Sequence, residues 1–578
     1  MKNMLLTGFS PLRWLVLVVL MLGLAQSAQA THLLGGEMTY RYLDASGPST
    51  APHRYEITLT VYNSCGAAAI RPFATIGIYS QATGDKLTLS TANYATLNNG
   101  NLSVPQTSID ACTTPLVPPG CTIVGESQAY QLQRFIGIVS LPATTTGYYA
   151  LWTDGNRNAG ITNISNPSDY EFMTLYSTLA PPSRPNSSPV FVEKAVANLC
   201  VNDTTYLLNN ATDADGDRLE YTLAQPYGEI TTTPPSTFVP APTLVPYAAA
   251  QYTAATPLGT AVGNYASINL NTGIAKYRTT APLGSKFVVA IDVKEYRIIN
   301  GQQVLIGVTR RDLQMVAVSC PSTVPPVLAI GTPPGPVVRN YTLEVGNTLT
   351  IPLVASQANG NPLALSASSV LLDGASGFNA TFGGSPGTLT VGNPAGTALM
   401  ASTSGPVAGT FVYTAGCNDA RATPYDVTLA VKDQGCAGKT IGDVLRITVV
   451  KPTGPTSIAG PLSVCGLNTL QTYTASGGTT PGMSWTVTGG TIVGSPTANP
   501  VQVRWPATGT GTIAAQGTTQ AGCPTGLVTR SVVVTPVPVL TVTGNQTICQ
   551  GGSTTLTVTG SNSPYLLTGG AASVTGAG

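Results

Sequence analysis

The chain has 578 residues, with 26 Lys and Arg against 25 Asp and Glu, so its formal net charge is +1. Charged residues make up only 9% of the sequence, against roughly 25% in an average soluble protein. Because there is no basic stripe and no polybasic run, this composition argues against nucleic-acid binding and against electrostatic attachment to a membrane surface. The 62 Gly and 45 Pro residues separate many short runs rich in Val, Thr, Leu and Tyr, which predicts an all-β chain of tandem β-sandwiches in an extended rod.

Residues 1–30 have the form of a secretory signal peptide. Lys2 and Arg13 provide the positive region, an apolar run of 12 residues follows, and Ala28-Gln-Ala30 forms a small-residue cleavage site. An apolar run of this length is too short to span a bilayer. We therefore expect a secreted or cell-surface protein whose mature chain begins near Thr31 and contains no membrane span.

Proline-rich segments divide the mature chain into modules. The predicted divisions are an N-terminal β domain at 31–185, a second module at 186–321, a third at 322–452, a fourth at 453–537 and an incomplete fifth at 538–578. Pro-rich connections are extended and semi-rigid, which favours the rod. The fifth module has about 40 residues where a β-sandwich typically needs about 100, so we expect the natural protein to continue past Gly578.

Trp152 is the candidate ligand-binding residue of the N-terminal domain. It precedes Thr153-Asp154-Gly155. Its ring is either buried in a sandwich core, the usual location, or exposed for stacking on a sugar.

An Asp-rich segment of the second module recurs in the third module without its charges. Ala211–Tyr221 aligns with Ala355–Leu365, and Gly216 recurs as Gly360. Amides stand at the positions of the three acids: Gln357 for Asp213, Asn359 for Asp215 and Asn361 for Asp217. The turn is therefore the shared element, and its charge is the variable one.

Three acids at this spacing suit calcium, which prefers six to eight oxygen ligands. Alternate side chains of an extended strand lie about 6.6 Å apart, so the segment must fold into a turn before its acids can share an ion. We predict a calcium site formed by Asp213, Asp215 and Asp217, joined by Asp292 from a later strand. The alternative is an Asx-type turn, in which the side chains accept local backbone N–H groups, as amides also can.

Ten cysteines in an exported chain indicate disulfides. Their positions within the modules predict three pairs: Cys200–Cys320, Cys417–Cys436 and Cys465–Cys523.

The sequence contains weak matches to catalytic motifs. The only Gly-x-Ser-x-Gly segment, Gly383–Gly387, has Pro386 after its Ser, and proline has no N–H to donate to an oxyanion. We therefore expect no enzyme activity.

Several longer strings are distinctive. They are Thr31-His-Leu-Leu-Gly-Gly-Glu-Met-Thr-Tyr-Arg-Tyr42, Asn186-Ser-Ser-Pro-Val-Phe191, Glu295-Tyr-Arg297, Arg311-Asp-Leu-Gln314 and, in the fourth module, Ser484–Gly490 with Val501–Trp505. They resemble strings in large gliding-motility-associated surface proteins of Bacteroidetes, and the last two resemble the PKD-like repeats of those proteins. The resemblance covers most of 31–537. It implies Ig-like, cadherin-like and PKD-like modules in an adhesin exported by the type IX secretion machinery.

The resemblance also bears on the cysteines of the N-terminal domain. Related proteins often carry a Cys-Cys pair before the Arg-Asn that stands here as Arg157-Asn158, and this chain lacks that pair. Three cysteines remain in the domain. We expect Cys112 to pair with Cys121, which leaves Cys65 over.

Together these features predict a non-enzymatic adhesin or structural stalk at the bacterial cell surface, linked to gliding motility or adhesion. The expected partners are extracellular ligands, including glycans, and the expected cofactor is calcium. The alternative is a secreted carbohydrate-binding protein or an accessory part of a polysaccharide-degrading enzyme.

Overall fold

The computed structural model describes residues 33–65, 71–89, 95–96, 101–114, 128–165, 167–229, 242–331, 338–374, 376–389, 395–436, 438–545 and 547–560. The predicted signal peptide at 1–30 lies outside these ranges. The described residues form strands and one short 3₁₀ turn, η1 (Ser168–Tyr170), so the all-β prediction is confirmed. No helix in the described part of the chain has the length and apolarity that crossing a membrane requires.

The chain divides into two compact units. The first contains Met1–Thr342, Leu349–Tyr413 and Arg421–Thr448, and the second contains Leu343–Thr348, Thr414–Ala420 and Val449–Gly578.

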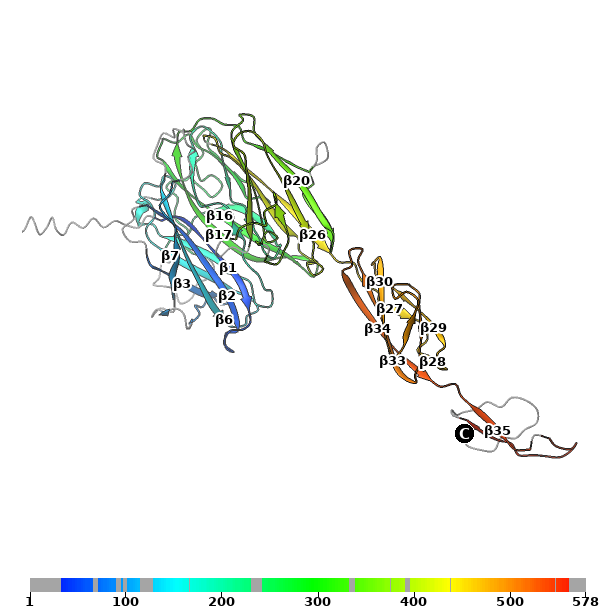
Figure 1. Ribbon diagram of the computed structural model, residues 1–578. Coiled ribbons are helices and arrows are strands. Elements are labelled where there is room, and N and C mark those ends of the chain that lie inside the picture. Colours follow the sequence, from blue (N-terminus) through cyan, green and yellow to red (C-terminus); the bar gives the residue numbers. More distant parts are fainter. Residues whose placement is uncertain are drawn as a thin grey trace, which may run out of the picture. The chain divides into compact units, whose positions relative to one another are not determined.

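The first unit is built on a 12-stranded sheet, part of which closes on itself. Figure 1 shows β1, β2 and β6 side by side in this sheet. The closed ring runs, in hydrogen-bonding order, through β1 (Leu33–Asp44), β2 (His53–Ser64), β6 (Tyr130–Leu141), β5 (Leu102–Ile109), β3 (Phe73–Ser80), β7 (Tyr148–Asp154), β8 (Met173–Leu179) and β17 (Gln302–Val318). The short β4 (Ala95–Thr96) pairs with β5. Strand pairing thus continues across residue 185, because β17 comes from the second module.

β17 is the strand that joins the N-terminal domain to the second module. One edge pairs with β16 (Lys286–Ile299), which in turn pairs with β13 (Arg218–Ala224). The other edge pairs in succession with β8 at Thr309, with β1 at Arg311–Leu313 and with β10 (Val196–Cys200) at Gln314–Val318. Two small sheets complete the second module: β11 (Thr205–Leu208), β15 (Ile274–Arg278) and β14 (Tyr265–Ile268), and β12 (Ala211–Thr212) with β9 (Val190–Phe191).

Two apolar cores lie on opposite faces of β1. Leu33 belongs to the core of the ring, and Leu34 belongs to the core of the second module. Successive side chains of a strand point to opposite faces, so one strand contributes to both cores. Burial of these cores, at about 25 cal/mol per Å² of apolar surface, is the main stabilising contribution.

The third and fourth modules each consist of two sheets. In the third module the sheets are β18 (Val327–Ile330), β20 (Thr348–Ser356), β24 (Val407–Thr414) and β22 (Thr381–Phe382), and β19 (Asn340–Glu344), β26 (Thr440–Val450), β25 (Tyr425–Asp433), β21 (Leu363–Ser369) and β23 (Gly396–Ala401). In the fourth they are β27 (Ser457–Ala459), β29 (Leu470–Ser476), β32 (Val501–Arg504) and β31 (Thr491–Val493), and β28 (Ser463–Cys465), β34 (Pro524–Thr535), β33 (Gly509–Thr518) and β30 (Gly482–Thr488). The fourth module buries Trp485 and Trp505 in its core. Beyond it, β35 (Leu540–Thr543) pairs with β36 (Thr557–Gly560).

Three disulfides join described cysteines: Cys65–Cys112, Cys200–Cys320 and Cys417–Cys523. The predicted Cys200–Cys320 bond is confirmed. Cys200 ends β10 opposite Val318 of the parallel strand β17, which places it beside Cys320 with a Cα–Cα distance of 5.4 Å.

The predicted Cys465–Cys523 and Cys417–Cys436 pairs are wrong. Cys465 lies opposite Thr535 at the end of β34, whereas Cys523 directly precedes the start of β34. The two are therefore separated by the length of that strand, and Cys465 is an exposed free thiol. Cys523 bonds Cys417 instead, so the disulfide formed by Cys436 does not involve Cys417.

The predicted Cys112–Cys121 pair is also wrong, because Cys112 bonds Cys65. Ser64 pairs with Tyr130 at the start of β6, and Thr113 forms a β-bridge to the same residue. Cys65 and Cys112 therefore meet beside Tyr130, although 47 residues separate them. Cys121 lies outside the described residues.

Candidate metal centre at the Asp-rich turn

The Asp-rich segment folds into an Asx-type turn, which was the alternative to the predicted calcium site. Asp213 Oδ1 accepts the backbone N–H groups of Asp215 at 3.0 Å and Asp217 at 2.9 Å. Gly216 has a φ of +77°, a conformation that glycine adopts without the steric penalty of a Cβ. The acids therefore build the turn themselves, before any ligand is considered.

The third module repeats this turn with amides. Gln357 Oε1 accepts the backbone N–H groups of Asn359 at 2.9 Å and Asn361 at 3.4 Å, and Gly360 has a φ of +70°. A single carbonyl oxygen accepts both bonds, so the turn does not depend on charge.

Glu295 of β16 joins Asp213 and Asp217, and Asp292 does not. The three acids each present an oxygen within 4.8 Å of the other two. Asp292 lies on the opposite face of β16 from the core residue Val293, and it forms a bidentate ion pair with Arg310 at 2.7 and 2.8 Å. The prediction of Asp292 as a ligand is therefore wrong. Alternate residues of a strand point to the same face. Glu295 lies two residues after the core residue Val293, and this spacing is the sequence signal that favours it over Asp292.

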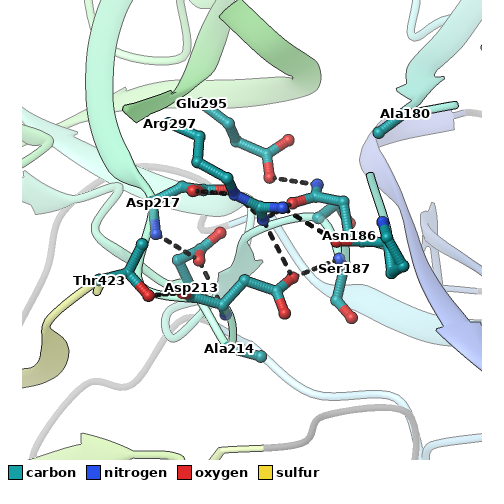
Figure 2. Close-up of polar contacts among 12 residues, drawn as sticks. Ala180, Asn186, Ser187, Asp213, Ala214, Asp217, Glu295, Arg297 and Thr423 are labelled. Atoms are coloured by element: carbon teal, nitrogen blue, oxygen red, sulfur yellow. Dashed lines mark hydrogen bonds and ion pairs between the residues drawn. The ribbon is translucent and has the colours of Figure 1, made fainter. Parts of the chain in front are cut away.

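Arg297 connects the acids to the linking segment at 180–189, which joins the first two domains and contains Asn186 (Figure 2). Arg297 donates to both oxygens of Asp217 at 2.7 Å and to Asn186 Oδ1 at 2.6 Å. Asn186 Nδ2 donates to Glu295 Oε1 at 2.9 Å. Asp215 Oδ2 accepts the backbone N–H of Ser187 at 2.6 Å, so Asp215 faces the linking segment and is not one of the three clustered acids.

Asp213, Asp217 and Glu295 are buried together, and the ion pair with Arg297 is made by Asp217. Asp213 and Glu295 are fully buried and Asp217 is 1% exposed. Burial, with Asp217 and Asp215 nearby, holds the pKa of Asp213 well above its usual range. Burial, with Asp213 nearby, does the same to the pKa of Glu295. Asp213 Oδ2 and Glu295 Oε2 have no hydrogen-bond partner among the residues that the structure describes. An all-oxygen set of this kind fits a hard cation such as calcium.

The outer side of the turn contacts the third module. Arg421 Nη1 donates to the carbonyl oxygen of Ala214 at 2.9 Å, and Thr423 Oγ1 donates to that of Asp215 at 2.5 Å. The turn therefore touches three parts of the first unit: the linking segment, its own module and the next one.

Asp426 of β25 is a buried acid in the third module, near the turn. Burial raises the pKa of Asp426 to about 6, although Arg446 at 3.4 Å and Arg421 act in the opposite direction. Asp213 and Tyr221 of the second module also lie in its electrostatic surroundings. Between the usual Asp pKa near 3.9 and this value, the native state binds more protons than the unfolded state, so stability falls as pH rises.

We therefore expect Asp426→Asn to remove a pH-dependent penalty. Relative to the variant, the wild-type chain should lose about 2–3 kcal/mol of unfolding free energy between about pH 4 and about pH 7. Urea unfolding of both chains at several pH values measures this difference. A difference that stays constant across the range would show that Asp426 titrates normally.

Trp152 is not available as a sugar-stacking residue. Its side chain is 5% exposed and packs in the core of the ring with Ile76 and Leu175. The prediction of a ligand-binding Trp152 is therefore wrong, and the buried alternative holds. A tryptophan in a strand interior adds more to stability by burial than it would on the surface.

No family model matches the chain, and no curated protein matches it. Solved structures with partial similarity include the fibronectin(III)-like modules of CbhA from Clostridium thermocellum (15% identity, 36% of this chain and 95% of that chain, TM-score 0.15). The human desmocollin-1 ectodomain is similar at 12% identity over 69% of this chain and 77% of that chain, with a TM-score of 0.16. EC1-4 of Drosophila N-cadherin is similar at 12% identity over 79% of this chain and 97% of that chain, with a TM-score of 0.17. At these TM-scores the similarities do not place the chain in a family.

Proposed function

We propose that this chain is a non-enzymatic extracellular protein with a structural or adhesive role. The observation that supports this most directly is the use of its buried charged groups. Arg157 pairs with Asp312, Arg311 with Glu37, and Arg297 with Asp217. Each pair joins segments far apart in the sequence, so these groups connect the fold rather than converge on a substrate.

Further features support an extracellular location at the bacterial cell surface. Disulfides persist in oxidising compartments, and this chain forms Cys65–Cys112, Cys200–Cys320 and Cys417–Cys523. The N-terminal 30 residues have the composition of a secretory signal. By its resemblance to gliding-motility-associated proteins, we infer export by the type IX secretion machinery and a role in adhesion or gliding.

Beads coated with residues 31–578 test the adhesive role. We expect them to attach to extracellular surfaces or glycans more strongly than beads coated with the same chain after reduction and unfolding. Equal attachment by both would contradict specific adhesion. Release of reducing sugars from a panel of polysaccharides would contradict the non-enzymatic assignment. Saturable binding of one glycan would favour a carbohydrate-binding protein.

A second test concerns the cellular role. In the bacterium that makes the protein, deletion of its gene should reduce colony spreading or surface attachment. Loss of type IX secretion should leave the protein inside the cell envelope. Normal surface display without that machinery would contradict the proposed export route.

A further inference from the structure

In the amide copy of the turn, hydrogen bonds within the module satisfy the carboxylate oxygens without a cation. Asn361 Nδ2 donates to Asp433 Oδ2 at 3.2 Å, and Asp433 Oδ1 accepts the backbone N–H of Gly435 at 2.7 Å. Asp433 pairs with Leu363 across strands β25 and β21. The single carboxylate of this turn therefore has a donor on each oxygen.

The acidic copy has the same strand pairing, but it cannot form the equivalent side-chain hydrogen bond. Glu295 pairs with Leu219, so it occupies the position that Asp433 occupies opposite Leu363. Asp217 stands where Asn361 stands, and an ionised carboxylate has no N–H to donate. The third module thus has a donor, Asn361, beside an acceptor, Asp433. The second module has two acceptors, Asp217 and Glu295, at the equivalent positions.

Arg297 neutralises only part of the resulting charge. Both oxygens of Asp217 accept hydrogen bonds from its guanidinium. Among the described residues, the ion pairs of Arg297 are with Asp217 and Asp215, not with Asp213 or Glu295. Asp213 Oδ2 is buried and accepts no hydrogen bond from the described part of the chain. In Figure 2 this oxygen is turned toward the side of the turn where Glu295 and Arg297 lie. Leaving a buried charged oxygen unpaired is costly, because it has lost its hydration without replacement.

We propose that Asp213, Asp217 and Glu295 form a site for one calcium ion. Every donor is an oxygen, and oxygen-only sites of irregular shape suit calcium better than zinc or copper, which prefer nitrogen and sulfur. The three oxygens lie within 4.8 Å of one another, a separation that ligands about 2.3–2.6 Å from a common ion can have. This inference does not depend on the proposed function.

Binding here would strengthen a junction rather than support a reaction. The ligands come from the turn and from β16, the adjoining Asn186 belongs to the linking segment, and Arg421 and Thr423 bring in the third module. An ion that fixes the turn therefore also fixes the backbone carbonyls to which the third module binds. The third module's own turn has no equivalent need, because its amides are already satisfied.

Calorimetric titration of residues 31–578 with CaCl2 tests the proposal directly. We expect one calcium ion to bind, and the Tm to rise by roughly 5–10 °C when free calcium is about 100-fold above Kd. The double variant Asp213→Gln, Asp217→Asn, which installs the amides of the third module, should lose both effects. Asp443→Asn, which removes an acid from an ion pair elsewhere in the first unit, should keep them.

Three outcomes would overturn the site. The first is no heat of binding and no Tm shift in the wild-type chain at millimolar calcium. The second is binding that persists in the double variant while circular dichroism shows it folded. The third is stabilisation by acid with no calcium effect, which would show that the acids share a proton. If the double variant does not fold, the wild-type titration and Glu295→Gln still decide the question.

Discussion

Replacing Arg157 with Met should lower the unfolding free energy of the first unit by about 3–5 kcal/mol. Arg157 donates to both oxygens of Asp312 at 2.9 and 2.7 Å and to the carbonyl oxygens of Phe172 and Tyr227. Both charged side chains are 1% exposed. Loss of the guanidinium leaves a buried carboxylate and two carbonyls unpaired, and that penalty is much larger than the net value of the pair.

Arg339→Met is the matched control. Arg339 also forms a bidentate pair, with Asp443 at 2.8 and 2.9 Å, but its side chain is 52% exposed. Water replaces the lost contacts there, so we expect a change of at most about 1 kcal/mol. Urea unfolding of both variants measures the difference. Similar losses would show that Asp312 finds another partner or water when Arg157 is removed.

Gly216→Ala should destabilise the chain by about 2–5 kcal/mol, whereas Gly360→Ala should cost only about 1–2 kcal/mol. Both residues adopt a positive φ, +77° and +70°, so both variants incur the strain of a left-handed alanine. A Cβ on Gly216 would also overlap the carbonyl oxygen of Pro424, while a Cβ on Gly360 meets nothing within 4 Å. The additional loss at Gly216 therefore reports on the contact with the third module, because overpacking typically costs about 1–3 kcal/mol.

Thermal unfolding of the two glycine variants, with the calcium concentration held constant, checks this difference. Equal destabilisation would mean that the turn and the third module separate easily. A calcium titration of Gly216→Ala would then show whether the turn still binds the ion once that contact is lost.

The two turns illustrate what a sequence can predict. Local spacing was sufficient to align Asp213 with Gln357 and to expect one turn in both modules, because hydrogen bonds between residues two and four apart depend on local order. The choice between Asp292 and Glu295 was harder. It depends on which face of β16 packs against the core. Val293 lies in that core, so Glu295, two residues later, is on the same face and Asp292 is on the other.

Long-range pairing was beyond the reach of local patterns. Arg157 and Asp312 are 155 residues apart, and Glu37 lies 274 residues before its partner Arg311. Glu37, Arg311 and Asp312 lie in distinctive strings of the sequence, but local patterns do not indicate that these residues form buried ion pairs with distant partners. The predictions of the Cys465–Cys523 and Cys417–Cys436 disulfides were wrong for a related reason. Whether Cys523 meets Cys465 or Cys417 depends on which end of β34 each one reaches.

The sharing of β17 has a consequence for the order of folding. Residues 33–179 are made before residues 302–318, so their ring at first lacks the strand that pairs with both β1 and β8. Until more than a hundred further residues have been made, those two strands present unpaired edges, which are sites of aggregation. Closure late in synthesis also makes folding slow, since contacts distant in sequence carry the largest loop-closure cost. We therefore expect residues 33–179 to depend on a chaperone, or to stay unfolded, until β17 has been made.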